Sequence, residues 1–335
     1  MLLLLLGCTS ASESSAKAED SPTEVQESRP DSADSSPDSP GHSAEDSPRE
    51  SPVDSTQDSG EDSSLPYDGH PCSSYLNAVV IGRVQDESLN ELSGLAVSRL
   101  NPGILWSHED SGGAAELYAL DFDGNRVATL TVEGVQNEDW EDLALFPSAT
   151  GWSLYIGDIG DRGTVRSLYA VLRVEEPVLI PGTVEYTVVP EVYTYSFPGD
   201  PEDAEALVVE GSGLPVILTK RTDATAGVYR FPTLSDGVVL DWLGDVPTGA
   251  TGEDLTARAT AADLWPDGSR LVLRSYFHLW EFSPAGDLAA LPAPVELSGA
   301  LEFQGEAVAY DPLQGGIWQL SEGVQPALNY IGCDD

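Results

Sequence analysis

The sequence has few basic residues. It contains 15 Lys and Arg against 57 Asp and Glu, which gives a formal net charge of −42 at pH 7. A chain this acidic repels the phosphates of nucleic acids and the headgroups of anionic lipids, so we expect it to bind neither directly. Cations and basic surfaces are the partners that such a charge attracts.

Motifs of common hydrolases and nucleotide-binding enzymes are also missing. The sequence has no G-x-S-x-G elbow, no H-E-x-x-H zinc motif and no glycine-rich phosphate loop. The catalytic candidates that remain are His108, as a general base, and Lys220 and Arg274, as phosphate ligands. Each of the three has a structural interpretation as well, as a strand-end histidine or a salt-bridge partner. The missing motifs therefore favour a binding module, without deciding whether the protein is an enzyme.

Cysteine is scarce, with three in 335 residues. The first ends the run Leu5-Leu6-Gly7-Cys8, which resembles the lipobox of bacterial lipoproteins. The resemblance implies that Cys8 is acylated and anchors the protein to a membrane outside the cytoplasm, with the outer membrane or cell surface favoured. Residues 1–8 contain no Lys or Arg and are short for an export signal, so we interpret them as a partial signal that starts further upstream. A chance run of leucines is the alternative.

The other two cysteines, Cys72 and Cys333, bracket the repeat-containing part of the chain. Once Cys8 is assigned to lipid, they are the pair left to form a disulfide, which is expected in an oxidising compartment. Closing a loop of about 260 residues stabilises a fold by a few kcal/mol in the chain-entropy model. Two free thiols are the alternative.

Residues 9–66 are rich in Ser, Asp, Glu and Pro and contain almost no aliphatic side chains. Such a segment buries too little apolar surface to fold, so the composition predicts a disordered linker with a net charge of −12. The chain is thus divided into a signal at 1–8, a linker at 9–66 and one folded domain at 67–335. A docking or phosphorylation role for the linker is the alternative.

The folded region contains five copies of one short apolar pattern. The copies begin at Ser93, Glu141, Glu205, Ala261 and Glu306, at intervals of 48, 64, 56 and 45 residues. Repeats of roughly 40–60 residues that each hold a few short strands are typical of a β-propeller. The predicted fold is an all-β, five-bladed propeller, whose ring is closed when the strand at 78–81 joins the C-terminal strands. Six blades are the alternative, because the longest interval contains additional strand-like runs at 185–189 and 192–195.

The turns between the strand-like runs favour antiparallel pairing. Asp123-Gly124 and Asp267-Gly268 each separate two apolar runs, as in tight β-hairpins. Helical periodicity is nearly absent, which agrees with an all-β domain.

Four motifs carry a resemblance to known proteins: Glu91-Leu92-Ser93-Gly94-Leu95-Ala96, Asp110-Ser111-Gly112, Asp139-Trp140-Glu141-Asp142-Leu143-Ala144 and Tyr155-Ile156-Gly157-Asp158-Ile159-Gly160-Asp161. Together they resemble a family of secreted, mostly uncharacterised bacterial β-propellers, distantly similar to WD40-like and esterase-like-phytase propellers. The resemblance covers about residues 75–332. It implies a fold and no particular activity, because propellers host unrelated functions. Glu109 and Arg162 stand where the family pattern has Asn.

The acidic residues of the repeats are candidate metal ligands. The first strand of a propeller blade lines the central channel, so Glu141, Glu205 and Glu306 are expected to converge there. Asp142 and Glu91 are expected near the rim, and a glycine-containing loop offers Asp158 and Asp161 as additional ligands. The candidates are Glu141, Asp142, Asp158, Asp161, Glu205 and Glu306. Carboxylates brought together raise each other's pKa unless a cation neutralises them, and Ca²⁺ prefers such oxygen ligands. Alternatively, these carboxylates accept hydrogen bonds from amides of neighbouring blades and hold the repeats in register.

The predicted function is that of a lipid-anchored, extracytoplasmic β-propeller that acts as a binding or scaffold module, with Ca²⁺ as a stabilising ligand. We expect a monomer that is held at the membrane through Cys8 and binds a protein or a small molecule. The alternative is a Ca²⁺-dependent hydrolase of phosphoesters or esters, of the phytase-like propeller type. An enzyme would place His108, Lys220 or Arg274 at one face beside the carboxylates, whereas a scaffold would leave them scattered.

Overall fold

The computed structural model describes residues 69–249, 256, 258–284 and 286–334. The chain divides into two units, Met1–Glu61 and Asp62–Asp335, and all described residues belong to the second. The predictions for residues 1–8, for Cys8 and for the linker at 9–66 therefore lie outside the described residues. Within the described ranges the regular secondary structure is almost entirely β-strand, with a one-turn 3-10 helix, η2 (Leu288–Ala290), and no helix there is long and apolar enough to cross a membrane.

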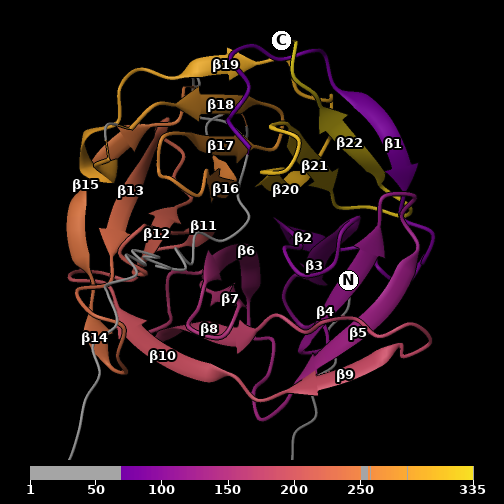
Figure 1. Ribbon diagram of the computed structural model, residues 1–335. Coiled ribbons are helices and arrows are strands. Elements are labelled where there is room, and N and C mark those ends of the chain that lie inside the picture. Colours follow the sequence, from indigo (N-terminus) through magenta and orange to yellow (C-terminus); the bar gives the residue numbers. More distant parts are fainter. Residues whose placement is uncertain (1–68, 250–255, 257, 285, 335) are drawn as a thin grey trace, which may run out of the picture. The chain divides into compact units, whose positions relative to one another are not determined.

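Five sheets, each with four antiparallel strands at its centre, are arranged around a central axis as the blades of a β-propeller (Figure 1). From the axis outward, the first two blades contain β2 (Leu92–Val97), β3 (Ile104–Glu109), β4 (Glu116–Asp121) and β5 (Arg126–Val132), then β6 (Trp140–Pro147), β7 (Trp152–Asp158), β8 (Tyr169–Glu175) and β10 (Glu191–Ser196). The next two contain β11 (Ala204–Val209), β12 (Pro215–Thr219), β13 (Thr225–Arg230) and β15 (Asp241–Pro247), then β16 (Ala259–Leu264), β17 (Leu271–Ser275), β18 (Leu279–Phe282) and β19 (Val295–Leu297). The fifth contains β20 (Gly305–Tyr310), β21 (Ile317–Ser321), β22 (Ala327–Ile331) and β1 (Val79–Arg83). The prediction of an all-β propeller with five blades is confirmed.

The hydrophobic core lies between the blades. Each of five clusters of buried apolar side chains joins the facing sides of two neighbouring sheets. The largest fully buried side chains are four tryptophans, Trp106, Trp140, Trp265 and Trp318. The inner strands β2, β11 and β20 are buried along their whole length, which explains why each appears in the sequence as an apolar run.

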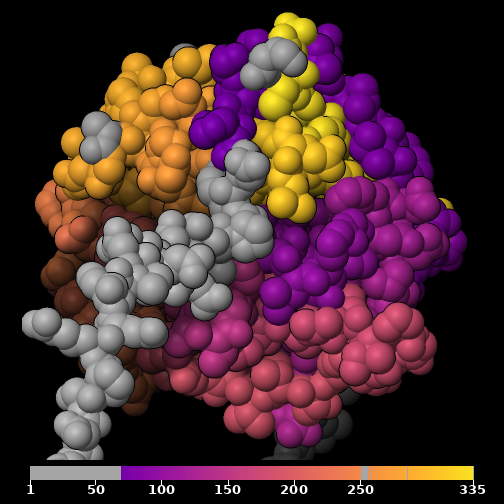
Figure 2. All heavy atoms as spheres, viewed as in Figure 1, coloured from indigo at the N-terminus to yellow at the C-terminus, as the bar shows by residue number. Residues whose placement is uncertain are grey.

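The two ends of the domain close the ring. Strand β1 pairs antiparallel with β22, with Val79 opposite Tyr330, and so completes the fifth blade. A disulfide joins Cys72 to Cys333, beside a β-bridge between Tyr75 and Cys333. The indigo and yellow segments adjoin on the surface (Figure 2). The predicted ring closure and the predicted disulfide are both confirmed.

The additional strand-like runs do not form a sixth blade among the described residues. Strand β10 is the fourth strand of the second blade, and β9 (Glu185–Val188) crosses to the first blade and pairs parallel with β5. The two-residue strand β14 (Val238–Val239) pairs with β10 in the same parallel manner. An outer strand exposes unpaired N–H and C=O groups, so β9 and β14 each cover a sheet edge that would otherwise be open.

Candidate functional site

A cavity of about 500 Å³ opens at the end of the central channel where the inner strands begin. Four of its rim residues immediately precede an inner strand: Asp139, Asp203, Arg258 and Gln304. The described lining contains seven carboxylates, from Asp110, Asp139, Glu141, Asp203, Glu205, Glu306 and Glu322. It contains three cationic side chains, from Arg162, Lys220 and Arg258. Negative charge therefore exceeds positive charge at this mouth when the carboxylates are ionised.

Each inner strand has a β-bulge near its start, and in three blades the bulge carries a side chain that lines this cavity. The pairing of every inner strand with its neighbour shifts at one position, and the residues at the shift are Gly94–Leu95, Glu141, Glu205, Thr260 and Glu306. A bulge inserts an extra residue and re-aims its side chain. Three bulges carry a glutamate, and each is at most 6% exposed. The repeat pattern in the sequence matches the bulge in these three blades and misses it by one residue in the first and fourth.

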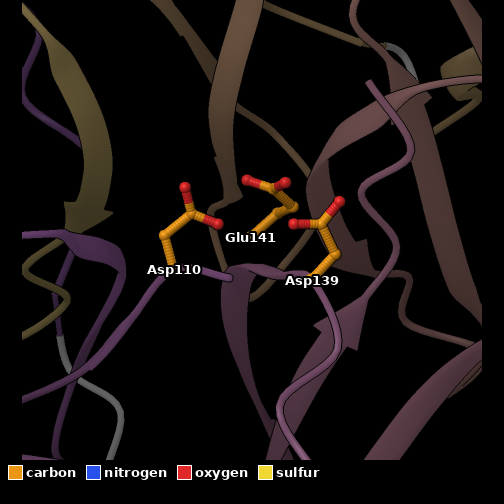
Figure 3. Close-up of side chains that lie close together, drawn as sticks. All are labelled: Asp110, Asp139 and Glu141. Carbon is orange, nitrogen blue, oxygen red and sulfur yellow. The ribbon is translucent and has the colours of Figure 1, made fainter. Parts of the chain in front are cut away.

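Three of the carboxylates form a cluster. Ligand oxygens of Asp110, Asp139 and Glu141 all lie within 4.8 Å of one another, and their side chains point toward a common centre (Figure 3). Asn137 holds the two loops together: its Nδ2 donates to the Asp110 carbonyl at 2.8 Å, and its Oδ1 accepts from the Trp140 amide at 3.0 Å. The cluster therefore joins the first blade to the second.

The Gly-Asp-Ile-Gly-Asp motif packs against this cluster. A Cβ atom on Gly160 would lie 2.1 Å from Glu141 Oε1 and 2.5 Å from Asp139 Oδ2, so only glycine leaves room for both carboxylates. Asp158 accepts a hydrogen bond from the Asp139 amide at 3.3 Å and forms an ion pair with Arg166 at 2.9 Å. Asp158 thus positions the backbone of the cluster, and its own charge is already paired.

Positive charge compensates the cluster only in part, through Arg166 near Asp139 and Lys220 near Glu141. Burial raises the pKa of Asp139 to about 6, and the nearby Asp110 adds to the shift. Burial also raises the pKa of Glu141 well above its usual value, assisted by Glu205 and Asp110. Shifts in this direction show that the ionised forms are disfavoured where they stand, and a bound cation would reverse them. Carboxylate oxygens are the ligands that Ca²⁺ prefers, and bidentate binding by three carboxylates approaches its coordination number. The residues present therefore fit Ca²⁺.

A lysine occupies the other side of the cavity. Lys220 forms an ion pair with Glu205 and lies 5.0 Å from the ring centroid of Tyr276. Burial lowers the pKa of Lys220, but Glu205 and Glu306 raise it more, so the ammonium group stays charged. Glu306 is 4% exposed, and its Oε2 accepts no hydrogen bond from any described residue. Lys220 therefore compensates the charge of two buried glutamates, Glu205 and Glu306, and leaves one oxygen of Glu306 without a hydrogen bond from a described residue.

Asp142 points away from this cavity and joins three blades. Its Oδ2 accepts hydrogen bonds from the Leu207 amide in the third blade at 2.9 Å and from the Ala262 amide in the fourth at 3.1 Å. Asp263 joins the fourth blade to the fifth in the same way, through the Tyr310 amide at 2.8 Å. Both contacts agree with the alternative prediction that acidic residues of the repeats accept hydrogen bonds from amides of neighbouring blades.

Two of the catalytic candidates are sealed in the interior. His108 is fully buried, its Nδ1 donates to the Glu109 carbonyl at 2.9 Å, and a Cβ on Gly94 would lie 2.6 Å from its Nε2. Arg274 is 1% exposed and forms an ion pair with Glu302 at 2.8 Å. Neither lines the cavity, so Lys220 is the one candidate of the three that reaches it.

Asp161 belongs to a loop that it holds in place. Its carboxylate accepts hydrogen bonds from the amides of Val165 and Arg166 and from the hydroxyl of Tyr169, at 2.8–2.9 Å. Burial raises the pKa of Asp161, but these donors lower it more, so the group stays ionised without a metal.

The structure thus brings together three of the six candidate ligands, Glu141, Glu205 and Glu306, and uses Asp142, Asp158 and Asp161 in protein contacts. Sequence reasoning missed Asp110 and Asp139 as ligands, although both lie in the acidic motifs. The available signal was position: Asp139 and Asp203 each directly precede a repeat strand, where a side chain reaches the channel rim.

No protein-family model matches the chain, and no curated protein matches it. The resemblance to a family of secreted bacterial propellers therefore stays a prediction. Several solved structures are similar at low identity. The PQQ-bound aldose sugar dehydrogenase from Streptomyces coelicolor is 12% identical, with a TM-score of 0.46 over 78% of this chain and 99% of that chain. The WD40 repeats of RRP9 are 9% identical, with a TM-score of 0.43 over 78% and 98%. A putative gluconolactonase is 11% identical, with a TM-score of 0.42 over 79% and 94%. We transfer no site from these likenesses.

Proposed function

We propose that the protein is a lipid-anchored, extracytoplasmic binding module whose central cavity binds a cationic ligand, with Ca²⁺ held by Asp110, Asp139 and Glu141. The observation that carries the proposal is the cavity itself: among the described lining residues, seven carboxylates face three cationic side chains, and buried Glu306 Oε2 has no described donor. A buried carboxylate without a partner is costly unless a cation enters beside it. Ligand binding at this mouth would remove that cost.

Ca²⁺ suits the cluster better than Mg²⁺. Calcium accepts irregular sets of six to eight oxygen ligands, whereas Mg²⁺ requires a nearly ideal octahedron and gives up its water reluctantly. The three carboxylates come from one side of an open cavity, so water or a ligand would complete the coordination. In the module, Ca²⁺ would tie the first blade to the second and stabilise the folded domain.

The proposed location rests on Cys8 and on the disulfide. A disulfide that joins the ends of the domain is stable in an oxidising compartment, which agrees with export. The lipid on Cys8 would hold the protein at a membrane, favoured to be the outer membrane or the cell surface, and residues 9–66 would act as a tether.

The geometry does not favour the hydrolase alternative. Lys220 reaches the cavity, where a charged lysine could hold a phosphate, but its ammonium group is already paired with Glu205. His108 and Arg274 are buried away from the cavity. Among the described residues, no base other than the carboxylates reaches the cluster.

Isothermal titration calorimetry of the full chain with Ca²⁺ at pH 7.5 tests the proposal. We expect one Ca²⁺ per chain, and an affinity lowered at least about ten-fold by Glu141→Gln or Gly160→Ala, because each removes or displaces a ligand oxygen. Gly163→Ala is the matched control, since its Cβ would meet nothing closer than 3.7 Å.

Thermal unfolding provides a second readout. At a hundred times its dissociation constant, Ca²⁺ adds about 2.7 kcal/mol to the free energy of unfolding, which raises Tm by roughly 5–10 °C. Absence of both heat and a Tm shift at millimolar Ca²⁺ would contradict the metal site.

A further inference from the structure

Two large apolar side chains stand exposed on a segment that borders the acidic cavity. Leu301 is 86% exposed and Phe303 is 89% exposed, and both belong to the segment between β19 and β20. Phe303 lines the cavity, whereas Leu301 lines a second depression of about 330 Å³. The segment therefore forms an apolar ridge beside the cavity.

The ridge is anchored rather than loose. The Ala300 amide donates to Gln319 Oε1 at 2.9 Å. Glu302 is 7% exposed and accepts hydrogen bonds from Arg274 Nη2 at 2.8 Å and Asn329 Nδ2 at 2.9 Å. Alternate residues are thus fixed inward, which holds Leu301 and Phe303 outward. Arg274, a catalytic candidate in the sequence, instead serves to hold this ridge.

The cavity beside the ridge retains negative charge for a ligand. It contains four more carboxylates than cationic side chains among the described residues, so one divalent ion would leave it negative when the carboxylates are ionised. Glu306 Oε2, which has no described donor, lies in β20, the strand that directly follows the ridge. A cationic group that enters here meets a carboxylate oxygen with free hydrogen-bonding capacity.

We infer that this rim is a docking surface for a segment of another protein that inserts a lysine or arginine side chain into the cavity and rests apolar neighbours on Leu301 and Phe303. The inference rests on the proposed function, since it uses the same acidic cavity. Protein interfaces are built around such anchors, with aromatic and cationic side chains seated in pockets.

Charge identifies the occupant as a different protein. The linker at 9–66 has a net charge of −12, and a second copy of the chain brings −42, so both are repelled from the cavity. Exposed apolar side chains on an anchored ridge are typical of a surface that is covered by a partner.

Fluorescence anisotropy with labelled synthetic peptides tests the inference on the full chain at roughly 0.15 M salt. The probes are short peptides with a central lysine flanked by leucines, the same lysine flanked by serines, and a glutamine flanked by leucines. We expect the leucine-flanked lysine peptide to bind at least about ten times more tightly than the other two, because only it fills both the cavity and the ridge.

Variants separate the two contributions. Phe303→Ser and Glu306→Gln should each weaken this peptide about ten-fold or more. Leu313→Ser, which changes a 57% exposed leucine beyond the other end of β20, and Glu133→Gln, which removes an exposed charge, are the controls and should stay within about two-fold.

Equal affinity for the two lysine peptides, no effect of Phe303→Ser, or no binding of any peptide would each overturn the inference. Calcium titration of the same proteins distinguishes this failure from failure of the proposed function. If Ca²⁺ binds to wild type and to Phe303→Ser while the peptides do not, only the docking surface is wrong. If neither Ca²⁺ nor peptides bind to wild type, the cavity is not a cation site and both are wrong.

Discussion

Replacement of Asp142 by alanine should loosen the contacts between three blades. The side chain is fully buried and accepts backbone hydrogen bonds from its own following residue, Leu143, and from Leu207 and Ala262 in two other inner strands. No other described carboxylate contacts three blades in this way. In Asp142→Ala all three amides lose their acceptor.

The expected loss follows from those three amides. A buried donor left without an acceptor costs about 1–3 kcal/mol, so three donors give a loss of about 3 kcal/mol or more. Burial raises the pKa of Asp142 well above its usual value, and removal of the charge recovers part of that cost, so we take the lower end of the range. Asp142→Asn keeps one carbonyl oxygen and should lose only about 1–2 kcal/mol.

Urea unfolding of the full chain, followed by tryptophan fluorescence, measures these changes because four tryptophans are fully buried. A loss of about 3 kcal/mol corresponds to a Tm lowered by roughly 6–12 °C in a domain of this size. Asp123→Ala, in an exposed hairpin turn, is the control and should stay within about 0.5 kcal/mol. A loss below about 1 kcal/mol in Asp142→Ala would refute the idea that this carboxylate joins the blades.

Two further predictions concern the disulfide and the buried histidine. Reduction, or the double change Cys72→Ser and Cys333→Ser, should lower the free energy of unfolding by about 2–5 kcal/mol, and the double variant should no longer respond to reductant; equal stability with and without reductant in wild type would contradict this. Burial lowers the pKa of His108 to about 4, so its imidazole is neutral in the folded protein at neutral pH. Its stabilising contribution is present above pH 6.5 and is lost as the pH falls toward 4, by up to about 3 kcal/mol. The unfolding free energy of wild type should therefore fall more steeply than that of His108→Asn over this pH range, and parallel profiles would count against the assignment.

The architecture followed from the sequence because its causes are local or covalent. Each blade is one short stretch of chain with its own hairpins, so the spacing of the repeats reveals the blade count. Ring closure and the Cys72–Cys333 disulfide follow from where the two cysteines lie relative to the repeats. The extra strand β9 was visible as a strand, but its partner β5 lies in another blade, and only the tertiary structure decides that pairing.

The sequence predicted that the site is acidic, but it did not predict which carboxylates form it. Acidic residues at the starts of the repeat strands pointed to a negatively charged channel mouth, and Glu141, Glu205 and Glu306 do meet there. A carboxylate's role depends on what lies opposite it across the sheet or in the next blade. For that reason Asp142 became an interblade contact.

What the sequence alone determined about this protein is its repeat number, its closure and its excess of negative charge, all of which are properties of composition and spacing along the chain. The tertiary structure decided which carboxylates converge, because a one-residue bulge in each inner strand sets the direction of its side chains. It also decided that Asp110 and Asp139 meet above Gly160, although they are separated in sequence and come from different blades. Contacts of that kind depend on packing between blades, which no local pattern in the sequence records.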